Sequence, residues 1–205
     1  MAALLVGAAI PAAAQQAQPA PAPASEAPKE DLVRVALDTE AGRIVLALDR
    51  GRAPVTTRNF LRYLESGRLD GINFYRAMKL WDGHGIVQAG VRDGAKLLPP
   101  VRHEPTSETG ILHEDGTVAM ARAKPGTAQG DFFITIGKVE GFDAGKDPSG
   151  DNLGFAAFGR VVDGMDVIRE LLGSPVSATK GEKEGMKGQM LDPPVKIVKA
   201  VKLAE

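Results

Sequence analysis

The sequence predicts a mainly β fold, an antiparallel barrel or sandwich with two helices packed against it. Short apolar segments of the length of a strand recur along the chain, and in some of them large apolar residues occupy every second position. Loops containing glycine or proline separate these segments. Only two isolated segments have the spacing of a helix, whereas a parallel sheet of βαβ units would show helices after most strands.

The first folded elements are expected to form a hairpin. Large apolar residues recur at every second position, first at Val33, Val35 and Leu37 and then at Ile44, Leu46 and Leu48, and the sequence EAG occupies 40–42. A short loop containing glycine joins antiparallel neighbours, so these two segments are predicted to pair.

Two segments show helical spacing. The first begins at Pro54, whose fixed φ suits a first helical turn, and Phe60 and Leu64 lie four positions apart in it. Gly67 is expected just past its end. The second helix is predicted over 163–173.

Further short strands are predicted at 73–77, 86–91, 117–121, 132–136 and 155–162. The last segment, 194–204, alternates as a strand does. No internal repeat occurs, and 43% of the 205 residues are apolar, which suffices for one sizeable core. We therefore predict a single folded domain over 31–205.

The N-terminal residues differ from the rest of the chain. MAALLVGAAIPAAAQ carries no charged side chain and is too short to span a bilayer. Its Ala-Ala-Ala sequence fits a signal-peptidase site, so residues 1–14 are predicted to be a signal peptide, although no Lys or Arg precedes the apolar run. The alternative is an Ala-rich disordered tail. Alternating Pro and Ala over 15–30 predict a disordered linker.

Composition excludes several classes of function. The formal net charge of −1 provides no field that would favour nucleic acid or an anionic membrane. The absence of cysteine excludes disulfides, thiol catalysis and Cys-based metal sites. The three histidines lack metal-ligand spacing, and no Gly-rich phosphate loop or GxSxG motif occurs, so neither a metal nor a cofactor is expected.

A series of other segments is informative: NFYRAM, GIVQAG, GTVAMARAKPGTAQGDFFI, GFDAG and FAAFGRVVDGMDVI. In this order and spacing they resemble the cyclophilin family of peptidyl-prolyl cis–trans isomerases, in particular its bacterial periplasmic branch. The resemblance extends from about Val33 to Leu203. It implies a closed eight-stranded antiparallel β-barrel with two capping α-helices and a site on its outer face.

The resemblance also implies roles for individual residues. Arg76 stands at the family's catalytic arginine and Gln88 at the glutamine beside it. The residues implied in substrate binding are Tyr75, Ile86, Ala121, Arg122, Ala123, Asp131, Phe133, Phe142 and Phe155.

These substrate-binding positions serve different parts of a bound peptide. Residues 121–123 match a backbone rail, and Phe133 matches the floor of the proline pocket. Phe142 and Phe155 match its rim. Neighbouring residues of a strand point to opposite faces, so one of Phe132 and Phe133 is expected in the core, and the order of the family motif implies that it is Phe132.

The chemistry fits these residue types. Amide resonance opposes rotation of an X–Pro bond with a barrier of about 18–20 kcal/mol. Rotation makes and breaks no covalent bond, so no nucleophile is needed. A permanently charged planar arginine can donate to the nitrogen of a twisted amide, and an apolar pocket strengthens this interaction.

Asp131 departs from the family pattern, because glutamine is usual directly before the two phenylalanines. An ionised carboxylate can only accept hydrogen bonds. We expect it either to bond Arg76 or Arg122 with charge assistance, or to face solvent. The first arrangement would weaken catalysis, whereas the last would change little.

The connection between Arg76 and Gln88 is a second departure, because it is longer than is usual in the family. Gly85 stands where an aromatic residue is expected. Trp81 and His84 are the candidates to replace that aromatic ring at the pocket rim.

The sequence thus predicts a peptidyl-prolyl isomerase of the bacterial periplasm that acts as a monomer on proline-containing segments of client proteins. It predicts no nucleic-acid partner and no membrane span. Asp131 and the altered rim leave one alternative open, a non-catalytic module that binds proline-containing segments.

Overall fold

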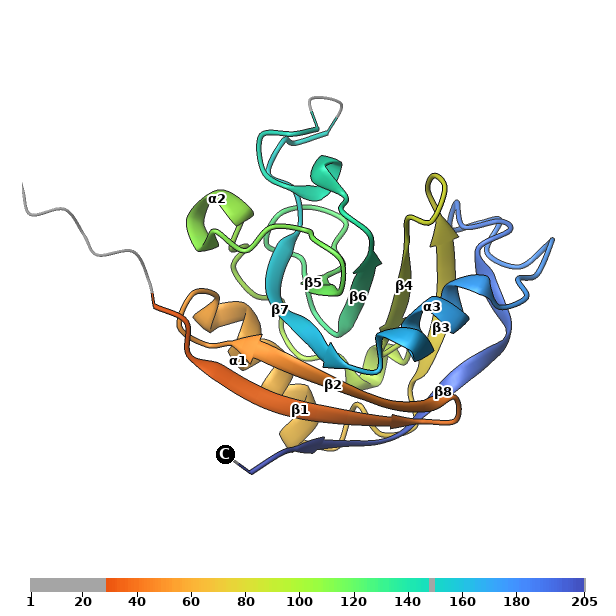
Figure 1. Ribbon diagram of the computed structural model, residues 1–205, viewed down its shortest axis with the longest axis horizontal. Coiled ribbons are helices and arrows are strands. Elements are labelled where there is room, and N and C mark those ends of the chain that lie inside the picture. Colours follow the sequence, from red (N-terminus) through yellow and green to blue (C-terminus); the bar gives the residue numbers. More distant parts are fainter. Residues whose placement is uncertain (1–28, 148–149, 205) are drawn as a thin grey trace, which may run out of the picture.

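The computed structural model describes residues 29–147 and 150–204. Within them, eight strands form one closed antiparallel barrel in the order β1-β2-β7-β5-β6-β4-β3-β8 (Figure 1). The strands are β1 Leu32–Thr39, β2 Gly42–Asp49, β3 Asn73–Lys79, β4 Gly85–Gly90, β5 Thr117–Met120, β6 Asp131–Ile136, β7 Ala156–Asp163 and β8 Met190–Lys202. The predicted mainly β barrel is confirmed. The predicted signal peptide, and the linker apart from its last two residues, lie outside the described residues.

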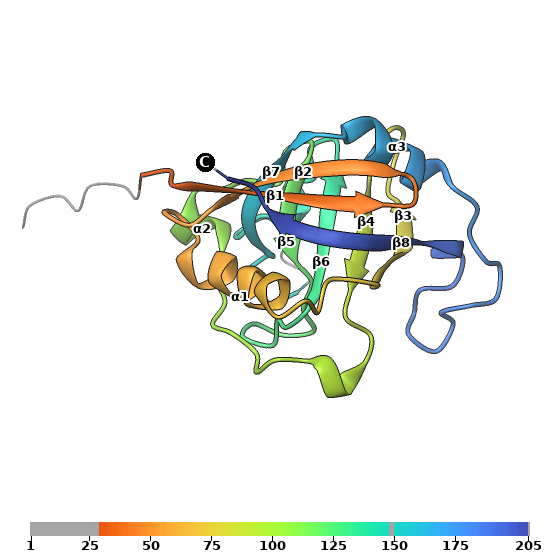
Figure 2. The same cartoon turned by 90° about the horizontal axis from the view of Figure 1, so that it is seen from below.

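Three α-helices accompany the barrel: α1 Pro54–Glu65, α2 Thr106–Thr109 and α3 Met165–Gly173. The two longer helices lie at opposite ends of the barrel (Figures 1 and 2). The sequence predicted both of them and missed α2, because four residues are too short to display a helical period. Two 3-10 turns, Gly94–Lys96 and Glu140–Phe142, lie in loops.

The start of α1 depends on a residue that is remote in the sequence. Ala53, at the N-cap position, has no side chain that could accept from the first turn. Instead the carboxylate of Glu104 accepts from the backbone N–H of Val55 at 3.1 Å and of Thr56 at 2.7 Å. A negative charge here satisfies N–H groups that the helix leaves unpaired and suits the helix dipole.

Aromatic rings contact one another inside the barrel, among mostly aliphatic core side chains. Phe60 of α1 packs edge-on against Phe132 at 5.2 Å between ring centroids and lies 5.5 Å from Phe158. Ile168 of α3 is buried at the other end. Phe132 therefore faces the core, as predicted, and Phe133 faces the outer side.

Strand β3 carries a bulge at Tyr75. Phe74 pairs with Ala89 and Arg76 pairs with Gln88, so Tyr75 has no partner of its own on β4. The pairing of β3 with β8 shifts at the same place. An extra residue breaks the strict alternation of faces, so the adjacent side chains of Tyr75 and Arg76 can both line the outer pocket.

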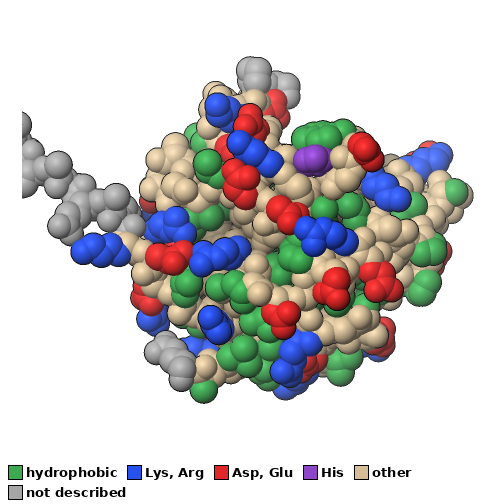
Figure 3. Space-filling model, viewed as in Figure 1, with side chains coloured by type: hydrophobic (Ala, Val, Ile, Leu, Met, Phe, Trp, Pro, Cys, Tyr) green, Lys and Arg blue, Asp and Glu red, His purple; other side chains and the backbone are tan. Residues whose placement is uncertain are grey.

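The surface mixes charges of both signs. Lysine and arginine side chains lie interspersed with aspartate and glutamate on the face shown in Figure 3, so this face presents no field of a single sign. None of the helices in residues 29–147 and 150–204 has the length and hydrophobicity required to cross a membrane.

Candidate active site

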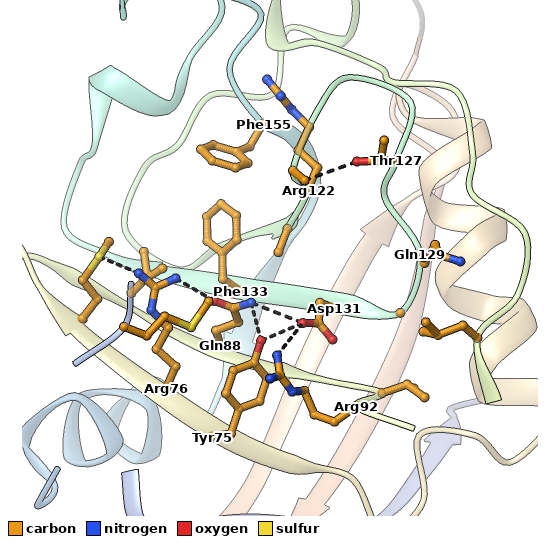
Figure 4. Close-up of a pocket in the computed structure, with 18 of the residues that line it drawn as sticks. Tyr75, Arg76, Gln88, Arg92, Arg122, Thr127, Gln129, Asp131, Phe133 and Phe155 are labelled. Atoms are coloured by element: carbon orange, nitrogen blue, oxygen red, sulfur yellow. Dashed lines mark hydrogen bonds and ion pairs between the residues drawn. The ribbon is translucent and has the colours of Figure 1, made fainter. Parts of the chain in front are cut away.

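A pocket of about 630 Å³ opens on the outer face of the barrel, beside β3, β4 and β6 (Figure 4). All of the site residues that the sequence suggested line it: Tyr75, Arg76, Ile86, Gln88, Ala121, Arg122, Ala123, Asp131, Phe133, Phe142 and Phe155. Residues far apart in the sequence thus meet in one place, because β4 pairs with both β3 and β6 in the barrel.

The guanidinium of Arg76 is held by neutral acceptors. Its Nε donates to Gln189 Oε1 at 2.7 Å, and its Nη1 donates to Gln88 Oε1 at 3.0 Å. Its Nη2 lies 3.0 Å from the sulfur of Met78. In the part of the chain that the structure describes, no carboxylate forms an ion pair with Arg76, so its positive charge is not neutralised by a neighbour.

A hydrogen-bonded chain determines which way the Gln88 amide faces. Tyr75 Oη donates to Asp131 Oδ2 at 2.6 Å. The Nε2 of Gln88 donates to Tyr75 Oη at 2.5 Å and lies 3.4 Å from Asp131 Oδ2. An ionised carboxylate only accepts and a guanidinium only donates, so the Gln88 amide must turn its N–H groups to Asp131 and its oxygen to Arg76.

The predicted partners of Asp131 were wrong. It bonds neither Arg76 nor Arg122, and its side chain, 26% exposed, does not simply face solvent. Its carboxylate ends the Tyr75–Gln88 chain and lies 4.0 Å from Arg92. The reason is geometric, because Asp131 pairs with Gly90 at the end of β4, on the Tyr75 side of Gln88.

Burial shifts the pKa values of this network. Desolvation raises the pKa of the Asp131 carboxyl above its usual 3.8, although the hydrogen bond from Tyr75 and the charge of Arg92 oppose this. Burial and the nearby Asp131 charge raise the pKa of the Tyr75 hydroxyl, so it remains a donor. Desolvation lowers the pKa of Arg76 below its ordinary value.

Three aromatic rings form the apolar part of the pocket. Phe133 lies at its base, with Phe142 and Phe155 edge-on to it at 5.5 Å and 5.2 Å between centroids. The rings of Phe142 and Phe155 also contact each other at 5.0 Å. Edge-to-face packing of this kind fixes each ring against the next and leaves a concave apolar surface.

A buried histidine supports this aromatic cluster from behind. The ring of His113 stacks on Phe133 at 6.0 Å, and its Nδ1 lies 2.7 Å from Asp143 Oδ1. Desolvation lowers the pKa of His113 from 6.5 and outweighs the opposing effect of Asp143. The neutral ring therefore donates from Nδ1, while its buried Nε2 has no hydrogen-bond partner among the described residues.

The segment 121–123 passes along the opposite wall. The side chain of Arg122 is only 7% exposed and is committed to the neighbouring loop, where it pairs with Asp151 at 2.7 Å and donates to Gly154 O at 3.0 Å. The guanidinium also lies over the ring of Phe155. Arg122 therefore secures the loop that carries Phe155, and only its backbone is available to act as a rail.

Comparison with known proteins agrees with this arrangement. The family model described as cyclophilin type peptidyl-prolyl cis-trans isomerase/CLD matches residues 33–201. The chain belongs to the cyclophilin-type peptidyl-prolyl cis–trans isomerase family. It is therefore an enzyme of that class.

Several relatives of this cyclophilin are known. It is 36% identical over 153 residues to peptidyl-prolyl cis-trans isomerase cyp18 of Streptomyces antibioticus, and the matched region covers 73% of this chain and 89% of that protein. It is 31% identical to peptidyl-prolyl cis-trans isomerase B of Escherichia coli, over 83% of this chain and 99% of the other. A solved cyclophilin of Cryptosporidium parvum shares the fold with a TM-score of 0.67 at 20% identity, covering 85% of this chain and 99% of that one.

The long β3–β4 connection of this cyclophilin does not complete the pocket rim. Trp81 is 53% exposed and stacks on His84 at 4.9 Å, and both line a separate hollow beside α3. The sequence left open whether one of them replaces the missing aromatic ring, and neither residue lines the pocket. Gly85 also leaves no room for a side chain, because a Cβ there would lie 2.5 Å from Met78 O and 2.8 Å from Leu172.

Sequence reasoning missed part of the pocket wall of this cyclophilin. The additional lining residues are Met78, Val91, Arg92, Leu97, Thr127, Gln129, Gly130 and Met186. It also missed Gln189, which contacts Arg76 from beyond α3. Met78, Thr127, Gln129 and Gly130 lie within the segments NFYRAM and GTVAMARAKPGTAQGDFFI, which could have suggested them, whereas no motif marks the other positions.

Proposed function

We propose that this isomerase accelerates rotation about X–Pro bonds in extended segments of exported or unfolded polypeptides, with Arg76 as its catalytic residue. The observation that carries the proposal is the setting of Arg76. Its charged guanidinium lines the same pocket as Phe133 and is oriented by neutral amide oxygens rather than by a carboxylate.

The free donors of Arg76 support the proposed mechanism. A guanidinium has five N–H groups. Three are used on Gln189, Gln88 and Met78, which leaves 5 − 3 = 2, one on each terminal nitrogen. These groups can donate to a twisted amide whose nitrogen has regained its lone pair, which lowers the barrier of about 18–20 kcal/mol.

The remaining walls suit the rest of an extended peptide. The apolar group of Phe133, Ile86 and Phe142 matches a proline ring in chemistry, and exclusion of water there strengthens the field of Arg76. The backbone N–H and C=O of Arg122 have no hydrogen-bond partner in residues 29–147 and 150–204, so they can pair with a substrate strand. One chain supplies all of these groups, so we propose that it works as a monomer.

The proposed location is the periplasm. Its support is the uncharged Ala-rich sequence of residues 1–14, followed by alternating Pro and Ala. Expression of the full chain in a Gram-negative host, followed by fractionation and N-terminal sequencing, tests this. The expected product is periplasmic and begins near Gln15. A cytoplasmic, unprocessed protein would rule out this assignment.

The test of the mechanism measures cis–trans exchange of an X–Pro peptide by NMR or by coupled proteolysis. Arg76→Ala is expected to lower kcat/KM by about a hundredfold or more, the loss typical of one preorganised donor. Arg76→Lys keeps the charge but not the planar fork, and is expected to recover little. Arg43→Ala, on the exposed surface of β2, is the control.

Circular dichroism must show that each variant is folded. Peptide binding without acceleration in the wild type would instead favour a capture module or chaperone. Unchanged catalysis in Arg76→Ala would remove Arg76 from the mechanism.

A further inference from the structure

The segment between α3 and β8 reaches the pocket at its end. Met186 lines the pocket, and Gln189 directly precedes β8. The backbone positions Gln189 beside β3, because its carbonyl accepts from the N–H of Ala77 at 2.8 Å and the next residue, Met190, pairs with Arg76. Gln189 is thus fixed at both its main chain and its side chain.

The side chain of Gln189 closes one edge of the Arg76 guanidinium. Its Oε1 accepts from Nε, while Gln88 Oε1 accepts from Nη1 on another edge of the same plane. Two acceptors on different edges restrict rotation of the group about its terminal bonds. One acceptor alone would leave the plane free to swing about that contact.

The local turn that presents Gln189 is well defined. Met186 N–H donates to Gly181 O at 2.7 Å, and Gln189 N–H donates to Met186 O at 3.0 Å. A Cβ on Gly181 would lie 2.6 Å from Met190 Cγ, so the turn packs tightly against the start of β8. Gly188 has φ +73°, a conformation that glycine adopts without strain.

We propose that Gln189 is a positioning residue for catalysis: it holds Arg76 in the orientation that faces the substrate amide, without neutralising its charge. This inference rests on the catalytic role of Arg76 proposed above. It assigns to the segment after α3 a part in the reaction, although no motif in that segment indicates one.

The experiment compares two substitutions with a matched control. Gln189→Met keeps the length of the side chain and replaces the amide oxygen by a thioether sulfur, a much weaker acceptor, whereas Gln189→Glu keeps an acceptor oxygen and adds a negative charge. Lys187→Ala, on the same turn, removes only an exposed side chain that pairs with Glu182. Line-shape NMR on an X–Pro peptide gives kcat and KM separately, and ¹H–¹⁵N spectra report the Arg76 Nε–H group.

Gln189→Met is expected to lower kcat about tenfold with little change in KM, the loss of roughly one hydrogen bond to a charged group. The Arg76 Nε–H signal is expected to shift or broaden in this variant. Gln189→Glu is expected to keep the Arg76 Nε–H group hydrogen-bonded but also to lower kcat, because its carboxylate would pair with the guanidinium and neutralise the charge. Lys187→Ala is expected to behave as the wild type. An unchanged kcat and an unchanged Arg76 signal in Gln189→Met would overturn the inference.

A double-mutant cycle separates this inference from the mechanism itself. If Gln189 acts through Arg76, adding Gln189→Met to Arg76→Ala causes no further loss. Additive losses would show that Gln189 acts independently of Arg76. If Arg76→Ala alone has full activity, the proposed catalytic role of Arg76 is wrong. This result differs from additive losses in the cycle, which would contradict only the positioning role of Gln189.

Discussion

Tyr75 donates its hydroxyl hydrogen to Asp131 at 2.6 Å, and this contact decides how Gln88 meets Arg76. Because the Tyr75 hydroxyl donates its only hydrogen to the carboxylate, its oxygen can accept a hydrogen bond from Gln88 Nε2. The Gln88 oxygen is then left for Arg76. The unusual acidic residue is therefore connected to the arginine through two neutral side chains, and the arginine keeps its charge.

This relationship predicts the effect of Asp131→Ala. Loss of the acceptor leaves Tyr75 and Gln88 donors unpaired, at a cost of about 1–3 kcal/mol, and lets the Gln88 amide turn away from Arg76. We expect kcat/KM for an X–Pro peptide to fall roughly tenfold. Asp131→Asn retains an acceptor oxygen and is expected to lose less. Wild-type kinetics in Asp131→Ala would show that the network does not tune the site.

The position of Phe155 at the pocket rim predicts that loss of its ring weakens substrate binding without slowing catalysis. Its half-buried ring contacts Phe133 and Phe142 at the pocket rim but does not touch Arg76. We expect Phe155→Ala to raise KM roughly two- to tenfold, since an edge-to-face aromatic contact is worth about 0.5–1.5 kcal/mol, and to leave kcat nearly unchanged. Leu153→Ala, on the same loop and exposed, is the control. A fall in kcat without a change in KM would contradict this role.

Glu104 predicts a loss of stability remote from the pocket. Its side chain is 1% exposed and accepts two backbone N–H groups of α1 as well as the Thr56 hydroxyl at 2.7 Å. We expect Glu104→Ala to lower the free energy of unfolding in urea by about 3 kcal/mol. Glu108→Ala, which removes an exposed partner of Arg102, is expected to change it by less than about 1 kcal/mol. Equal effects of the two variants would contradict the capping role.

His113 predicts a dependence of stability on pH. Burial depresses its pKa in the folded state below the ordinary 6.5. The folded chain therefore binds fewer protons than the unfolded chain at mildly acidic pH, so this contribution to stability is complete above pH 6.5 and declines as pH falls below it. His113→Gln is expected to flatten the pH dependence in this window. An NMR titration in which the His113 ring protonates at or above pH 6.5 would contradict this prediction.

Local sequence patterns were sufficient to predict most of the strands and both long helices. Large apolar residues at every second position, Ile44, Leu46 and Leu48, indicate a strand that is now seen in the barrel, and Gly67 adopts φ +67° just past α1, as predicted. The two-residue period of a strand placed Phe132 and Phe133 on opposite faces, and the order of the family motif assigned Phe132 to the core and Phe133 to the pocket. These features depend on neighbours in the sequence, so the sequence carries them directly.

The site residues were identifiable only as an ordered series. Arg76 on its own is one arginine on a strand, and its place in the pocket was predicted from the resemblance of all segments together. The bulge at Tyr75 was not predicted, although it is what allows two adjacent side chains to line one pocket.

Only the tertiary structure decided which partners meet at the site. Asp131 bonds Tyr75 rather than an arginine, Gln189 reaches Arg76 across 113 positions of sequence, and Trp81 stays outside the pocket. Closure of the barrel sets the register of β3 against β4 and β8 and so brings these side chains together or keeps them apart. A short sequence pattern indicates on which face of a strand a side chain lies, whereas a contact between residues distant in the sequence forms only after the strands have paired.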